Sequence, residues 1–166
     1  MYFYRCIPVI TVICVLLSGC SLIEETAVSP KRMVSSYYEE IVKTDKPLEL
    51  DLAADSANIE VYSWDKKEVK FEITKKVRGT QTREELEKML NGFNISCTGE
   101  NGRITFKSEY KGPIRSTVDI SIDLKVYIPK KITSVNCKLD IGRIRIYDDM
   151  KGSLNVAVNM ANVDIN

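Results

Sequence analysis

The stretch from residue 135 to residue 166 carries one pattern twice, and this repeat limits the fold more than any other feature of the chain. Apolar and polar residues alternate, which is typical of a strand with one buried face. One position is skipped at Gly142 and Arg143, and a skipped position over a small residue indicates a bend. The pattern returns nineteen residues later with Ala161 and Asn162 in the same places. The apolar positions are Val135, Cys137, Leu139, Ile141, Ile144 and Ile146, then Leu154, Val156, Val158, Met160, Val163 and Ile165.

An earlier stretch matches the first copy at a constant offset of eighty-five residues. Asp55 then aligns with Asp140 and Tyr62 with Tyr147, although only four positions of the alignment are identical. Chance agreement is therefore the alternative to true repetition. Units of this kind cannot bury their apolar faces alone, so we expect them to stack. The aligned apolar residues are Leu50, Leu52, Ala54, Ile59 and Val61, followed by Val69, Phe71 and Ile73, which fall on Leu154, Val156 and Val158.

The remaining segments predict further strands and one helix. Residues 35–42 are expected to add an edge strand, and residues 93–97 and 103–107 to form a hairpin around an Asn-Gly turn. Residues 118–128 alternate without a break, which predicts a strand with one buried face. Thr82 and Glu85 form a capping box that starts a short helix near residues 83–91.

The fold class that follows is all-β, with stacked short strands in a β-helix, β-solenoid or β-sandwich arrangement. We expect the one helix to pack across an open end or face of the sheet.

The composition excludes several classes of function. The chain has no histidine, which removes the commonest general base and the commonest metal ligand. Its net charge is +1 with both signs interspersed, so it lacks the basic surface of a nucleic-acid-binding protein. We expect no catalytic residues, no metal and no cofactor.

The first residues indicate export. Arg5 precedes an apolar run over residues 7–17, which is too short to span a bilayer and suits a signal peptide. The run ends in Leu17, Ser18, Gly19 and Cys20, which resembles the lipobox of bacterial lipoproteins. That resemblance implies cleavage after residue 19, a lipid on the Cys20 thiol and a location on the extracytoplasmic face of the membrane, with residues 20–34 as a tether. An uncleaved signal anchor is the alternative, and the envelope type stays open.

Two cysteines remain for the folded part, Cys97 and Cys137. The compartment permits a disulfide between them. Both lie among apolar residues of expected strands, so we favour free, buried thiols that pack as small apolar side chains.

The layout over residues 35–166 resembles a family of bacterial surface domains of unknown function that are named putative adhesins. The resemblance rests on three stretches: residues 50–61, residues 126–129 and residues 139–146. It implies stacked β-rungs and no known catalytic residues. Such domains usually continue for several more rungs, so we expect the domain to extend beyond residue 166.

Three groups of side chains are candidates for a functional site. Asp55, Asp140 and Asp164 suggest a calcium site, but aspartate at a bend more often closes a local turn. Asp148 and Asp149 form a carboxylate pair of the kind used in sugar cleavage, but adjacent strand residues point to opposite sides. Four aromatic residues are expected near a surface, where they would either contact a sugar or pack across strands. They are Tyr62, Trp64, Tyr127 and Tyr147.

The leading hypothesis is a lipid-anchored binding or interaction module at the cell surface, with a protein or polysaccharide partner. An unpaired last strand would also favour self-association through residues 153–166. The alternatives are an enzyme that acts on envelope polysaccharide and a structural or signalling accessory of the envelope. Fold alone does not choose among them.

Overall fold

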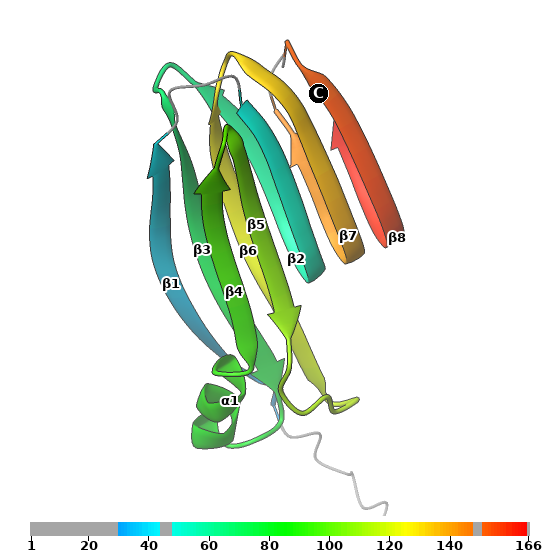
Figure 1. The fold of residues 1–166 in the computed structure, drawn as a ribbon. Coiled ribbons are helices and arrows are strands. Elements are labelled where there is room, and N and C mark those ends of the chain that lie inside the picture. Colours follow the sequence, from blue (N-terminus) through cyan, green and yellow to red (C-terminus); the bar gives the residue numbers. More distant parts are fainter. Residues whose placement is uncertain (1–29, 44–47, 148–150, 166) are drawn as a thin grey trace, which may run out of the picture.

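The computed structural model describes residues 30–43, 48–147 and 151–165. They form an all-β fold with one short helix, as predicted (Figure 1). The elements are β1 (Arg32–Lys43), β2 (Leu48–Trp64), β3 (Glu68–Gly79), α1 (Arg83–Leu90), β4 (Phe93–Glu100), β5 (Arg103–Tyr110), β6 (Val118–Pro129), β7 (Ile132–Ile146) and β8 (Ser153–Ile165).

Strands β2, β7 and β8 stack in parallel in the register that the repeat predicts. Leu50 lies beside Val135, which lies beside Leu154, so the offsets of eighty-five and nineteen residues are those of the strand pairs. The register holds on both sides of the skipped position, where Gly142 lies between Ala57 and Ala161. The weak sequence match therefore reflects true structural repetition along these three strands.

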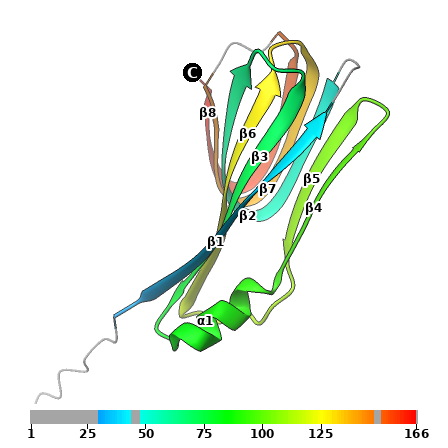
Figure 2. The same ribbon diagram turned by 90° about the vertical axis from the view of Figure 1, so that its left-hand side faces the viewer.

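Each of these long strands bends and so belongs to two layers (Figures 1 and 2). The first part of β2 pairs with β5, and its second part pairs with β6. The β5 layer thus contains β4, β5 and the first parts of β2, β7 and β8. The β6 layer contains β1, β3, β6 and the second parts of the same three strands.

The core lies between the two layers. Inward residues alternate along every central strand, and the rings of Phe71 from β3 and Phe106 from β5 meet with their centroids 5.7 Å apart. Burial of such a side chain contributes on the order of 1.5–3 kcal/mol. In β6, Ile122, Leu124 and Val126 are fully buried, which confirms the predicted one-sided strand.

The predicted extension of the repeat into residues 69–73 is wrong. Strand β3 lies antiparallel between β1 and β6 and does not align with β8. The segment between β2 and β3, residues 65–67, is too short to carry the chain to the start of a parallel strand, which needs a crossover of a dozen or more residues. Instead, the chain reverses direction at the end of β2, and β3 runs antiparallel to β6 within the β6 layer.

The smaller elements follow their local sequence signals. The Thr82 hydroxyl accepts a hydrogen bond from the amide of Glu85 and the Glu85 carboxylate accepts one from the amide of Thr82, so the capping box is present. Helix α1 buries Leu86, Met89 and Leu90 against β1 and β3, at one end of the β6 layer. The Asn101-Gly102 turn has positive φ at both residues and joins β4 to β5.

The two cysteines are free and lie three strands apart. One row across the β5 layer runs from Cys97 through Phe106 and Leu52 to Cys137. Strands are spaced about 4.8 Å apart, which places the two Cα atoms roughly 14 Å from each other. A disulfide needs Cα atoms within about 7 Å, so the two residues cannot pair. Burial raises the pKa of each thiol to about 12.

Some predictions concern residues outside the described ranges or at their boundary. The signal peptide, the lipobox, Cys20 and the pair Asp148 and Asp149 lie outside them. The expected edge strand is confirmed as β1, but it begins at Arg32, within the segment assigned to the tether. The described residues contain one helix, which is eight residues long and too short to span a bilayer.

Among the described strands, β8 is the last of the stack. It pairs with β7 along one edge, and no described strand covers its other edge. Side chains that continue the inward rows of β7 are consequently open to solvent, with Val158 40% and Val163 38% exposed. This edge offers backbone hydrogen-bonding groups beside apolar side chains.

Gly142 lies in the bend of β7, where the stack leaves no room for a side chain. Its φ is +137°, and an added Cβ would lie 1.9 Å from the carbonyl oxygen of Ala57. We expect Gly142→Ala to lower the free energy of unfolding by at least about 2 kcal/mol, because backbone strain adds to the overlap. Urea unfolding measures this. The matched control is Asp140→Ala in the same bend, which should stay within about 0.5 kcal/mol of the unmodified protein. Equal stabilities of the two variants would contradict the stacked bend.

Candidate functional site

The structure brings the four predicted aromatic residues together on the outer face of the β6 layer. Tyr127 on β6, Tyr62 on β2 and Tyr147 directly after β7 lie side by side, because Tyr62 pairs with Tyr127 and the amide of Tyr147 bonds to the carbonyl of Val61. Trp64 lies beside Tyr127 at a centroid distance of 5.4 Å. We call these four side chains the aromatic row.

The rings of the aromatic row stack on one another. The Tyr62 ring lies 4.7 Å from that of Tyr147 with an interplanar angle of 1°, and 5.3 Å from that of Tyr127. The Lys66 ammonium lies 4.6 Å from the Trp64 ring centroid. The faces of Tyr62 are thus occupied by its neighbours, which is the cross-strand packing weighed above. Contact of these four residues with a ligand stays a prediction.

The tyrosine hydroxyls hold a carboxylate in place. The Tyr62 hydroxyl donates to Oε2 of Glu60 at 3.0 Å, and the Tyr147 hydroxyl lies 3.4 Å from Oε1 of the same residue. Burial, followed by the hydrogen bond to Glu60, raises the pKa of Tyr62 above its ordinary value. The aromatic row therefore fixes the orientation of Glu60, which lies in the next row of the sheet.

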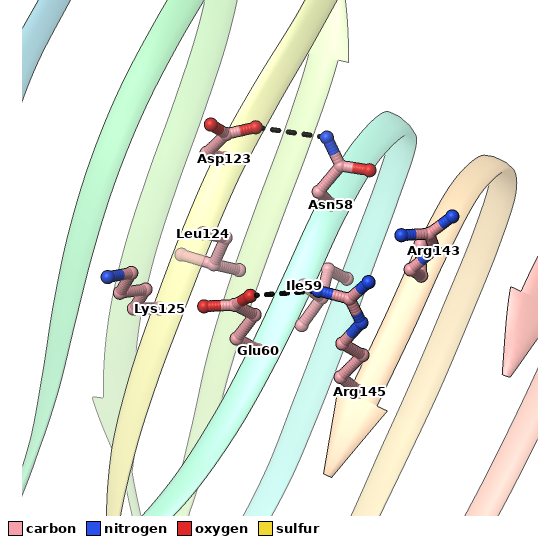
Figure 3. A pocket seen from close by; sticks show the side chains of 8 residues that line it. All are labelled: Asn58, Ile59, Glu60, Asp123, Leu124, Lys125, Arg143 and Arg145. Carbon is pink, nitrogen blue, oxygen red and sulfur yellow. Dashed lines mark hydrogen bonds and ion pairs between the residues drawn. The ribbon is translucent and has the colours of Figure 1, made fainter. Parts of the chain in front are cut away.

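Glu60 forms part of a polar pocket of about 350 Å³ over β6, β2 and β7 (Figure 3). The side chains of Ile59 and Leu124 point into the core, so only their backbone faces the pocket and forms its floor. This volume lies within the range of small-molecule sites in proteins. The other lining residues are Asn58, Glu60, Asp123, Lys125, Arg143 and Arg145.

The register of the sheet places these polar side chains in two rows. Asn58 on β2 lies between Asp123 on β6 and Arg143 on β7. In the next row Glu60 lies between Lys125 and Arg145. All of them alternate with buried residues and so share the outer face, which is why one sheet surface collects two carboxylates, one amide and three cations.

Most of these charges have partners. Asp123 accepts hydrogen bonds from the Asn58 amide, at 3.0 Å, and from the Lys76 ammonium on β3. The Arg145 guanidinium lies 3.5 Å from Glu60 and 3.6 Å from Asp164 on β8. The pocket is thus held rigid by interactions that tie β3, β6, β2, β7 and β8 together.

Sequence reasoning did not single out Asn58, Asp123, Arg143 or Arg145 as site residues. A signal was present for three of these four, because the offset of eighty-five residues aligns Asn58 with Arg143 and Glu60 with Arg145. Nothing in the sequence showed that β6 would lie on the other side of β2, and that neighbour supplies Asp123.

The aspartates weighed for calcium have other contacts. Asp55 accepts a hydrogen bond from the Tyr110 amide at 3.1 Å, which ties the bend of β2 to the last residue of β5. Asp164 pairs with Arg145, and Asp140 is exposed. Within the described residues no three acidic or cysteine side chains cluster as metal ligands would.

Comparisons with known proteins found similarity to solved structures alone. No family model matches the chain, and no curated protein matches it. A putative cell adhesion protein from Clostridium sporogenes is 8% identical, with 80% of this chain and 99% of that chain covered and a TM-score of 0.37. A putative adhesin from Parabacteroides merdae is 12% identical, with coverage of 78% and 56% and a TM-score of 0.38.

A third similar structure is a putative lipid binding protein from Parabacteroides distasonis, which is 13% identical, with 78% of this chain and 60% of that chain covered and a TM-score of 0.36. The chain thus spans little more than half the length of the two Parabacteroides proteins. Scores at this level assign no function to any residue.

The raised pKa of Tyr62 predicts how stability depends on pH. The neutral phenol is favoured in the folded state, so its contribution is fully present below about pH 10, the ordinary value for tyrosine, and is lost as the pH rises further. Tyr62→Phe keeps the ring but removes the bond to Glu60, which should cost about 1 kcal/mol at pH 7 and reduce the fall in stability above pH 10.

Urea unfolding between pH 7 and pH 11 measures both effects. Tyr127→Phe is the matched control, since its ring lies in the same row and its hydroxyl makes no hydrogen bond within the described part of the chain. If both variants show the same pH dependence, the Tyr62 hydroxyl does not hold Glu60.

Proposed function

We propose that the protein is a lipid-anchored binding module on the extracytoplasmic face of a bacterial membrane, and that its outer-face pocket binds an envelope polysaccharide. The observation that carries the proposal is the convergence of one amide, two carboxylates and three cationic side chains on a pocket of about 350 Å³. Sugar hydroxyls both donate and accept hydrogen bonds, so they suit a surface that offers amide, carboxylate and guanidinium groups side by side.

The anchor is supported by the sequence of the export segment. A lipoprotein signal requires an apolar run followed by small residues before the cysteine. Here the run ends at Leu17, and Ser18 and Gly19 precede Cys20. Two acyl chains on Cys20 would hold the protein at the membrane, whereas one chain gives only marginal binding. The chain between Cys20 and β1 would then place the folded part beside the envelope polymers.

The pocket suits binding better than sugar cleavage. A glycosidase needs one protonated carboxylic acid beside the scissile bond. Here Glu60 and Asp123 each accept hydrogen bonds or ion pairs from more than one donor, so neither carboxylate is free to act on a glycosidic bond. The pocket also lies on the surface of a sheet, where water is not excluded from a reacting bond. We therefore propose a protein without catalytic activity.

The polysaccharide proposal predicts that the pocket residues determine affinity. Asp123→Ala removes an acceptor and releases Asn58, so we expect at least tenfold weaker binding, equivalent to about 1.4 kcal/mol. The measurement is isothermal titration of the full chain, in mild detergent, with soluble fragments of envelope polysaccharide. Asp119→Ala is the matched control, because Asp119 lies on the same face of β6 and outside the pocket. Absence of binding by the unmodified chain, or equal affinity of both variants, would refute the proposal.

The exposed edge of β8 supports a second candidate function, association with another copy of the chain. An unpaired edge with apolar side chains is a template for strand pairing. Static light scattering of the concentrated chain should show a dimer, and Val158→Lys should abolish it by placing a charge among the inward residues. Asn159→Lys is the control, since its side chain points outward from the same strand. A chain that stays monomeric at high concentration would refute association through residues 153–166.

A further inference from the structure

Arg143 is one of two charged residues of the pocket for which the described part of the chain supplies no ion-pair or hydrogen-bond partner. Its side chain lies on the outer face of β7, half-buried against the sheet, between Asn58 on β2 and Asn162 on β8. Among the residues that the structure describes, no carboxylate or carbonyl oxygen bonds to its guanidinium. The neighbouring charges are already engaged, since Glu60 pairs with Arg145 and Asp123 with Lys76.

The surroundings of Arg143 supply amides instead of a counter-ion. Asn58 uses its amide nitrogen to bind Asp123, which leaves its oxygen on the side that faces β7 (Figure 3). Arg145, two residues along the strand, projects from the same face (Figure 3). Alternate residues of a strand lie roughly 7 Å apart along the backbone. Two guanidinium groups thus stand side by side, and Glu60 and Asp164 balance only one of them.

Lys125 is the other cation of the pocket that lacks a partner within the described chain, but its position is different. It is exposed, and its ammonium points away from Glu60 and Arg145, toward β3 (Figure 3). A lysine there remains fully hydrated and needs no counter-ion. Arg143, by contrast, is half-buried and carries a planar guanidinium, and such a fork of donors matches the two oxygens of a carboxylate or a phosphate.

We propose that the polysaccharide bound in this pocket is anionic, and that the Arg143 guanidinium binds its carboxylate or phosphate group in a bidentate manner, with Asn58 and Asp123 bonding the adjacent hydroxyls. This inference rests on the proposed function and adds the chemical class of the ligand. The shared chemistry is an oxyanion on a hydroxyl-rich envelope polymer, either the carboxylate of a uronic acid residue or the phosphate of a sugar or polyol phosphate.

The test uses three probes of matched length with the full chain in mild detergent. They are an oligogalacturonate, a neutral galacto-oligosaccharide and an oligo(glycerol phosphate). We expect one of the two anionic probes to bind at least tenfold more tightly than the neutral one. That preference should fall as salt is raised from about 50 mM to 500 mM, because screening weakens the charge interaction at a partly exposed site. The anionic probe that binds more tightly distinguishes carboxylate from phosphate.

Arg143→Gln should remove the preference, so that the variant binds the anionic probe no more tightly than the neutral one. Arg143→Lys should restore only part of the preference, because an ammonium cannot bind two oxygens in one plane. Arg78→Gln is the matched control: it removes the same charge from the outer face of the β6 layer, on β3 outside the pocket.

The outcomes separate this inference from the proposed function. Equal binding of neutral and anionic probes by the unmodified chain would overturn the inference that the ligand is anionic. The polysaccharide site itself would still be supported. An anionic preference that survives in Arg143→Gln would also overturn it, because the oxyanion would then bind elsewhere. Absence of binding by all three probes would refute the polysaccharide site itself.

Discussion

The parallel stacking of β2, β7 and β8 is the constraint on which the rest of the structure depends. Each strand bends once, and the bends coincide because Ala57, Gly142 and Ala161 lie in one row. A side chain on Gly142 would meet the backbone of β2, so the strands can approach only with a small residue there. The position of the bend fixes the register, so each residue of β2 after the bend pairs with one particular residue of β7.

This register determines which side chains meet at the site. It places Asn58 beside Arg143 and Glu60 beside Arg145, and it places Tyr147, directly after β7, against the ring of Tyr62. Strand β6 then completes the surface from the other side of β2. The polar pocket and the aromatic row are adjacent rows of one sheet, and the tyrosine hydroxyls that hold Glu60 join the two. A one-residue slip between β2 and β7 would turn the arginines into the core, so the site and the fold share one determinant.

The sequence predicted the parts of this arrangement that depend on local pattern. The alternation in residues 118–128, the capping box at Thr82 and the Asn101-Gly102 turn each specify one element. The two offsets went further and predicted the register of β2, β7 and β8. The same alignment failed at Val69, because alternation shows which face of a strand is buried but does not give its direction or its layer.

The candidate site could be predicted only in part. Tyr62, Trp64, Tyr127 and Tyr147 were expected near a surface, and the structure places them in one row. Their stacking on one another depends on the order of strands β6, β2 and β7, which no local pattern contains. Asp123 and Lys76 were missed for the same reason, since the antiparallel contact between β3 and β6 joins segments nearly fifty residues apart.

The most direct test of the central claim is a backbone amide map of the ligand site. Titration of the isotope-labelled chain with the best-binding oligosaccharide, followed by nuclear magnetic resonance, would locate the contact surface. We expect the largest shift changes at Asn58, Glu60, Asp123 and Arg143, on three strands that are adjacent in the β6 layer. Shift changes confined to β4 and β5, or to the exposed edge of β8, would contradict it.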